Sequence, residues 1–206
     1  MTEKLIRDAL ILWATIDPIG TLAVFVAVTS KLDAAQRRRA ALKAILYASA
    51  ILIGSIVIGQ VLLSSMGIRL ISFQVAGGII LFIFGLQMIF GTGAAGGTPA
   101  KEPGHDVAVF PLAIPSIATP GAILAVILLT DNHLFDMTTQ AMTAGLLLAI
   151  LAVTLIFMLA ADFILRIIGH NGASILVRVM GMILAALSIE FVMEALRIPQ
   201  WIGQVL

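Results

Sequence analysis

The sequence has no cysteine and few charged residues. Only 11% of its 206 residues are Asp, Glu, Lys or Arg, whereas 61% are hydrophobic and the mean hydropathy is +1.14. Without cysteine there are no disulfides and no thiolate ligands for a metal. With a net charge of +1 and no basic tail, the chain is not expected to bind nucleic acid. A soluble domain of this size cannot bury so much apolar surface, so the composition indicates an integral membrane protein in contact with the lipid bilayer.

Motifs of several enzyme and pump classes are also missing. There is no GxSxG, no HExxH and no GxxxxGK[ST], so the sequence shows no nucleophilic serine, zinc pair or ATP-binding loop. The three histidines, His105, His133 and His170, fall in loops or at the ends of apolar runs. A passive channel would place polar residues along a pore, whereas the few here cluster at one depth. We therefore expect neither an enzyme, nor a cofactor, nor a resident metal.

Six apolar runs are long enough to cross a bilayer. In lipid every backbone polar group needs a partner within the chain, which favours helices of roughly 20 residues. The expected spans are residues 6–28, 40–63, 68–90, 109–130, 139–165 and 174–196. Residues 91–108 are rich in glycine and proline and read as a flexible linker. The prediction is an all-α membrane protein whose residues 1–206 form one six-helix domain.

Positive charges predict the orientation of these spans. The loops after spans one, three and five contain eight of them: Lys31, Arg37, Arg38, Arg39, Lys43, Lys101, Arg166 and Arg178. The other side has four: Lys4, Arg7, Arg69 and Arg197. Since basic loops stay in the cytoplasm, both termini are expected outside and residues 91–108 inside. Trp201 and Arg197 read as anchors at the membrane interface.

Two spans are interrupted by proline near their midpoints. Asp17-Pro18 lies in the first span, and Thr119-Pro120 lies in the fourth. Proline at the first position of a helix is a start signal, so Pro18 and Pro120 mark helix breaks. The expected half-helices begin at Gly20-Thr21 and at Thr119-Pro120. Both the first and the fourth helix are therefore predicted to be broken at mid-membrane.

The two halves of the chain resemble each other. Pro18 aligns with Pro120 at an offset of 102 residues, and Gly78 aligns with Gly181 at an offset of 103. Each half, residues 1–90 and 109–206, contains three expected spans. An odd number of spans makes the second half enter the membrane from the opposite side. The prediction is a 3+3 inverted repeat, an arrangement typical of secondary transporters with a site at mid-membrane.

The breaks predict a binding site for a small molecule that has both an anionic and a cationic group. N–H groups at helix starts attract a carboxylate, and Asp17 would hold an ammonium, a coupling Na⁺ or a proton. An amino acid has both groups. The expected substrate-binding residues are Asp17, Gly20, Thr21, Thr119, Gly121 and Ala122. In the alternative interpretation the prolines only kink packed helices and Asp17 caps the break, although an aspartate at the membrane centre costs about 2.5–3.5 kcal/mol and usually has a function.

Other residues of the third and sixth spans are secondary candidates. Glu190 aligns with Gln87 in the repeat, and either a proton or cation site or an interhelical hydrogen bond would explain Glu190. Gly77, Gly78 and Gly181 are expected to let neighbouring helices approach closely.

Four motifs carry a resemblance to a known family. "DPIG" at 17–20, "FQVAGGIILF" at 73–82, "PLAIPSIATPGAI" at 111–123 and "RVMGMILAALSIE" at 178–190 are similar to those of the MarC family, also called NAAT or UPF0056. The family is grouped with the LysE-type transporters. The resemblance covers nearly the whole chain and implies a six-helix prokaryotic inner-membrane protein. It also implies transport of small neutral amino acids. Thr21 stands where the family commonly has Asn, and Glu190 stands where many members have Gln.

The leading hypothesis is thus a secondary transporter of small neutral amino acids resembling glycine, alanine or serine, coupled to H⁺ or Na⁺. The alternative is an exporter of amino acids or related small metabolites. An intramembrane enzyme and a passive channel rank lower for the reasons given above.

Overall fold

A computed structural model describes residues 2–91 and 106–197, and within them every regular element is a helix. The elements are α1 (Thr2–Ile16), α2 (Pro18–Thr29), α3 (Ala34–Ser65), α4 (Leu70–Phe90), η1 (Ala108–Ile117), α5 (Pro120–Leu129), α6 (Met137–Leu159) and α7 (Ala161–Ala195). Most of the expected linker, together with Lys101, His105 and Trp201, lies outside the described residues, as does the side chain of His170.

The helices are long and apolar enough to cross a membrane. Five qualify on their own, with α1 and α2 taken as one, and the bent pair of η1 and α5 makes a sixth. Many large apolar side chains on their outer faces are exposed, among them Leu46, Val57, Phe90 and Ile156. Bilayer contact accounts for such exposure, which water would disfavour. The predicted all-α membrane fold is confirmed.

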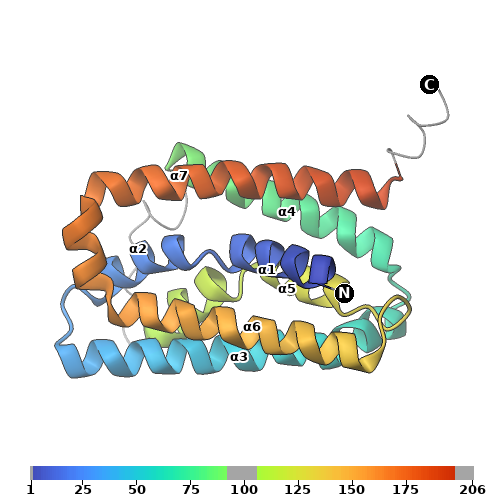
Figure 1. The fold of residues 1–206 in the computed structure, drawn as a ribbon, viewed down its shortest axis with the longest axis horizontal. Helices are drawn as coiled ribbons and strands as arrows, with labels where there is room; N and C mark the ends of the chain where they lie inside the picture. Colours follow the sequence, from blue (N-terminus) through green and yellow to red (C-terminus); the bar gives the residue numbers. More distant parts are fainter. Residues whose placement is uncertain (1, 92–105, 198–206) are drawn as a thin grey trace.

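The broken helices lie in the middle of three layers (Figure 1). In that view α4 and α7 form one outer layer, α3 and α6 form the other, and α1, α2 and α5 run between them. Burial follows the same order, since α5 is mostly buried and the most apolar stretch of α1 and α2 is 61% buried, against 11% for that of α3. The start of α1 and the end of α7 lie at the same end of the bundle.

One predicted boundary is wrong. The fifth span was expected to reach residue 165, but α6 ends at Leu159 because Ala160 leaves helical geometry. The next residues, 161–168, form a short helical arm across the end of the bundle (Figure 1) before Gly169 turns the chain with φ 67°. This arm contains Asp162, whose carboxylate lies 2.9 Å from the Arg37 guanidinium. A segment with an exposed ion pair fits the membrane interface better than the bilayer interior.

The same end of the bundle contains a second ion pair. Lys43 Nζ on α3 lies 2.8 Å from the carboxylate of Asp106, just before η1. The Lys43 ammonium holds the pKa of Asp106 below its ordinary value, mainly through this hydrogen bond. The helix α3 itself begins with a capping box in which Asp33 and Gln36 bond each other's backbone amides. Charge and capping groups therefore gather at this end, as expected of a headgroup region.

Glycine brings α4 and α7 into backbone contact. A Cβ atom added to Gly85 would lie 2.9 Å from both the Gly181 carbonyl oxygen and the Ala185 nitrogen. One added to Gly181 would lie 2.8 Å from the Gly85 carbonyl oxygen. Gly78 packs against Val192 and Ser188 in the same way, and Gly77 packs against Leu124 of α5. Small residues at these positions let the helices touch, as in other membrane bundles.

Candidate functional site

The first helix breaks at Asp17. This residue has φ 48° and ψ 73°, a left-handed conformation that aspartate tolerates better than most residues. Its Oδ1 accepts a hydrogen bond of 3.0 Å from Gly20 N, so the carboxylate caps α2. A Cβ atom on Gly20 would collide with Asp17 Oδ2, which explains the glycine. The half-helix begins at Pro18 and not at Gly20-Thr21 as predicted, because Asp17 itself is the cap.

The second break lies between η1 and α5, whose axes differ by 54°. Thr119 caps α5, and its Oγ1 accepts from Ala122 N at 2.8 Å. Pro120 is the first residue of α5, as the sequence predicts. The same hydroxyl donates to the carbonyl oxygen of Thr15, near the end of α1, at 2.8 Å. One threonine therefore begins its own helix and closes the end of another.

A reciprocal bond joins the breaks from the other side. Thr21 Oγ1, in the first turn of α2, donates to the carbonyl oxygen of Ser116 in η1 at 3.1 Å. The Ser116 hydroxyl in turn donates to Thr21 Oγ1 at 3.4 Å. All of these groups are buried. The two breaks thus form one buried polar cluster at the middle of the bundle.

A small cavity of about 40 Å³ opens at this cluster. Its lining comes from α2, α4, η1 and α7 and from the break itself: Asp17, Gly20, Thr21, Val24, Phe84, Gln87, Met88, Gly91, Pro115, Ser116 and Val177. The structure therefore brings together four of the predicted residues: Asp17, Gly20, Thr21 and Gln87. Asp17 is 2% exposed. The cavity combines a carboxylate, two hydroxyls and an amide within apolar walls.

Three predicted substrate-binding residues do not line this cavity. Thr119 is occupied by its two hydrogen bonds. A Cβ atom on Gly121 would collide with Leu81, and Ala122 is fully buried. These residues pack α5 against neighbouring helices and do not face the cavity.

Sequence reasoning missed Ser116 and Pro115, although both lie in a quoted motif. The Thr119-Pro120 pair is the more obvious signal in this motif, because a proline after a threonine is a familiar helix start. The chain in fact already departs from helical geometry at Phe110 and Ile114, each followed by a proline. Reading the prolines of "PLAIPS" as part of the break would have pointed to Ser116.

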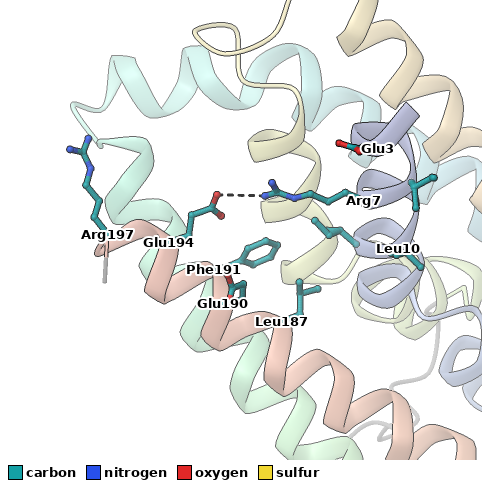
Figure 2. Close-up of a pocket in the computed structure, with 10 residues that line it drawn as sticks. Glu3, Arg7, Leu10, Leu187, Glu190, Phe191, Glu194 and Arg197 are labelled. Carbon is teal, nitrogen blue, oxygen red and sulfur yellow. Dashed lines mark ion pairs between the residues drawn. The ribbon is translucent and has the colours of Figure 1, made fainter. Parts of the chain in front are cut away.

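Glu190 lies elsewhere, in a second and larger hollow (Figure 2). This crevice of about 830 Å³ lies between the first half of α1 and the last turns of α7. Arg7 and Glu194 form an ion pair of 3.5 Å across it. Glu190 is exposed there, on the part of α7 that lines the crevice. Gln87 lines the cavity and Glu190 the crevice, and the two hollows share no lining residue.

The apolar helices, the absence of strands among the described residues and the buried polar breaks define an integral membrane protein of the all-helical class. The model described as "MarC family integral membrane protein" matches residues 2–199. The chain belongs to the MarC family.

Relatives from bacteria and archaea match along nearly their full length. The UPF0056 inner membrane protein YhgN of Escherichia coli (strain K12) is 29% identical over 195 residues, which cover 95% of this chain and 97% of the relative. A UPF0056 membrane protein of Methanocaldococcus jannaschii is 30% identical over 190 residues, 90% of this chain and 92% of the relative. A UPF0056 membrane protein of Archaeoglobus fulgidus is 33% identical over 191 residues, which cover 90% of this chain and 88% of the relative. No solved structure matches the chain.

Proposed function

We propose that the chain is a secondary transporter of small neutral amino acids that binds its substrate in the cavity at the Asp17 break. The observation that carries this proposal is a buried carboxylate at a helix break in the middle of a membrane span. Placing a charge at the membrane centre is costly, so an aspartate that lines a cavity there is expected to bind a ligand. Asp17 would hold the substrate ammonium or a coupling Na⁺ or H⁺.

The remaining polar groups suit the rest of an amino acid. Thr21 and Ser116 offer hydroxyls and Gln87 offers an amide, all of which bind a carboxylate. The start of α2 adds the positive end of a helix dipole. A hollow of about 40 Å³ has room for roughly three waters, which favours a substrate as small as glycine, alanine or serine.

The two hollows support alternating access. The cavity lies toward the end of the bundle that contains the α2–α3 loop, and the crevice lies toward the end with the start of α1. The proposal includes an inverted repeat in which the crevice opens outside and the cavity is reached from the cytoplasm. If residues 2–90 and 108–195 fail to superpose about an axis in the membrane plane, the repeat is wrong.

Uptake into proteoliposomes tests the function. Labelled glycine, alanine and serine are offered under an imposed proton gradient, an imposed sodium gradient or neither, with protein-free liposomes as the control. We expect accumulation of at least one of them above the control, dependent on one gradient. Counterflow from preloaded vesicles tests export, the alternative direction. Transport of another solute with none of the amino acids would contradict the proposal.

The orientation of the chain in the membrane is tested by cysteine labelling. The chain has no cysteine of its own, so each introduced thiol is labelled without background. Leu134→Cys places a thiol in the α5–α6 loop, and Lys31→Cys places one in the α2–α3 loop, both at exposed positions. A membrane-impermeant maleimide added to intact cells should label the first and not the second. Both should react after the cells are opened. The reverse pattern would show that the basic loops face outward.

A further inference from the structure

A buried ion pair near the start of α1 has no part in the proposed transport site. The Asp8 side chain is 1% exposed, and the Lys4 ammonium lies 2.5 Å from its Oδ2. Both residues are in the first two turns of α1, at the end of the bundle opposite the cavity. A charge pair this deep is more than a surface contact, since each group has lost most of its water.

The ammonium is surrounded by groups from three further parts of the chain. Lys4 Nζ donates to Thr143 Oγ1 of α6 at 3.2 Å and to the carbonyl oxygen of Leu129 at 3.3 Å. Leu129 is the last residue of α5, where the helix dipole is negative. The Phe135 ring centroid lies 4.1 Å from the same nitrogen. Asp8, Thr143, Leu129 and Phe135 thus form what we call the Lys4 cage.

The cage has more acceptor capacity than Lys4 can use. An ammonium has three N–H donors, and Asp8, Thr143 and Leu129 take all three. Thr143 Oγ1 also donates to Asp8 Oδ2, at 2.7 Å. Asp8 Oδ1 is fully buried, and no donor among the described residues bonds it. Buried carboxylate oxygens are almost always paired, so this one is a further oxygen that could bind a cation in place of the Lys4 ammonium.

We propose that the Lys4 cage is a binding site for a small monovalent cation, filled in this chain by its own ammonium. Carboxylate, hydroxyl and carbonyl oxygens with an aromatic face suit Na⁺ or NH₄⁺ as well as a tethered ammonium. Lys4 supplies that cation permanently and joins α1 to α5 and α6. The wild-type chain therefore needs no Na⁺ from solution at this site. This proposal does not depend on what the cavity transports.

Replacing the tethered cation tests the proposal. Purified Lys4→Met protein is unfolded thermally in the chlorides of Na⁺, NH₄⁺ and choline at one ionic strength. We expect a lower midpoint than wild type in choline, because Asp8 has lost its partner. Na⁺ or NH₄⁺ should raise the midpoint of the variant by about 3 °C or more over choline. The wild-type midpoint should be the same in all three salts.

Two control variants separate the cage from general salt effects. Arg7→Met removes another cation of α1, but Arg7 is 62% exposed in its pair with Glu194, so no preference among the salts is expected. Adding Asp8→Asn to Lys4→Met should abolish the preference, because the cage then lacks its charge. Equal midpoints in the three salts for Lys4→Met would overturn the proposal. If that variant does not accumulate, Lys4→Ser is measured in the same salts, and equal midpoints again overturn it.

Discussion

Asp17→Asn is expected to abolish amino-acid transport while leaving folded protein in the membrane. The substitution removes the charge that would hold the substrate ammonium or the coupling cation, and it nearly preserves the side-chain volume. A charge-assisted hydrogen bond is worth about 1.5–3 kcal/mol, so substrate binding should weaken at least about tenfold. The fold should survive, because asparagine caps helices as well as aspartate does and also tolerates a left-handed backbone such as φ 48°.

The measurement is uptake by proteoliposomes at matched protein content. Asp131→Asn is the matched control, since Asp131 is also a buried aspartate, 5% exposed, but it lies after α5 and outside the cavity. Its Oδ1 accepts from His133 N, an acceptor role that asparagine can keep. We expect the control to transport normally. Near wild-type uptake by Asp17→Asn would show that Asp17 serves only as a helix cap.

Gly85→Ala and Gly181→Ala are expected to destabilise the protein strongly. In both cases the new methyl group would lie less than 3.0 Å from backbone atoms of the facing helix, which cannot move aside as a side chain can. Separating α4 from α7 should cost roughly 1–3 kcal/mol or more, as overpacking does in other interiors. The thermal midpoint in detergent, and the fraction of protein that stays monodisperse, should both fall.

Gly54→Ala on α3 and Gly145→Ala on α6 are the controls. A Cβ atom at either position meets nothing within 4 Å, and alanine favours helix over glycine. These variants should be as stable as wild type or slightly more stable. If all four substitutions have the same effect, close contact between α4 and α7 does not stabilise the bundle.

The spans and their breaks could be predicted because hydropathy and proline act locally. Lipid requires helices wherever about 20 apolar residues follow one another, and a proline interrupts the hydrogen-bond ladder in any surroundings. Predicting the site also required knowing which way each helix faces in the bundle. Thr119 and Gly121 are residue types expected at a helix start that binds a ligand. In the structure Thr119 bonds α1 and Gly121 packs against Leu81 of α4, because the way a helix faces is set by its packing.

Contacts between distant segments were the part that sequence could not supply. Lys4 and Asp8 look like an ordinary pair one turn apart, and only the arrival of Thr143 and Leu129 makes their surroundings a cage. Glu190 and Gln87 align in the repeat, but alignment says nothing of exposure. They line different hollows because they lie toward opposite ends of the bundle.

The reciprocal hydroxyl bonds between the breaks bear on how the bundle can bend. Thr119 caps α5 and donates a hydrogen bond to α1, while Thr21, in the first turn of α2, donates one to η1. Each break is therefore hydrogen-bonded to the other. A tilt of α1 away from α5 stretches the Thr119 bond, and a tilt of α2 away from η1 stretches the Thr21 bond. The two breaks are therefore linked in both directions, and a bend at either of them strains a hydrogen bond to the other. A molecule that displaces the Thr21 hydroxyl from Ser116 would remove one of these two links when it binds.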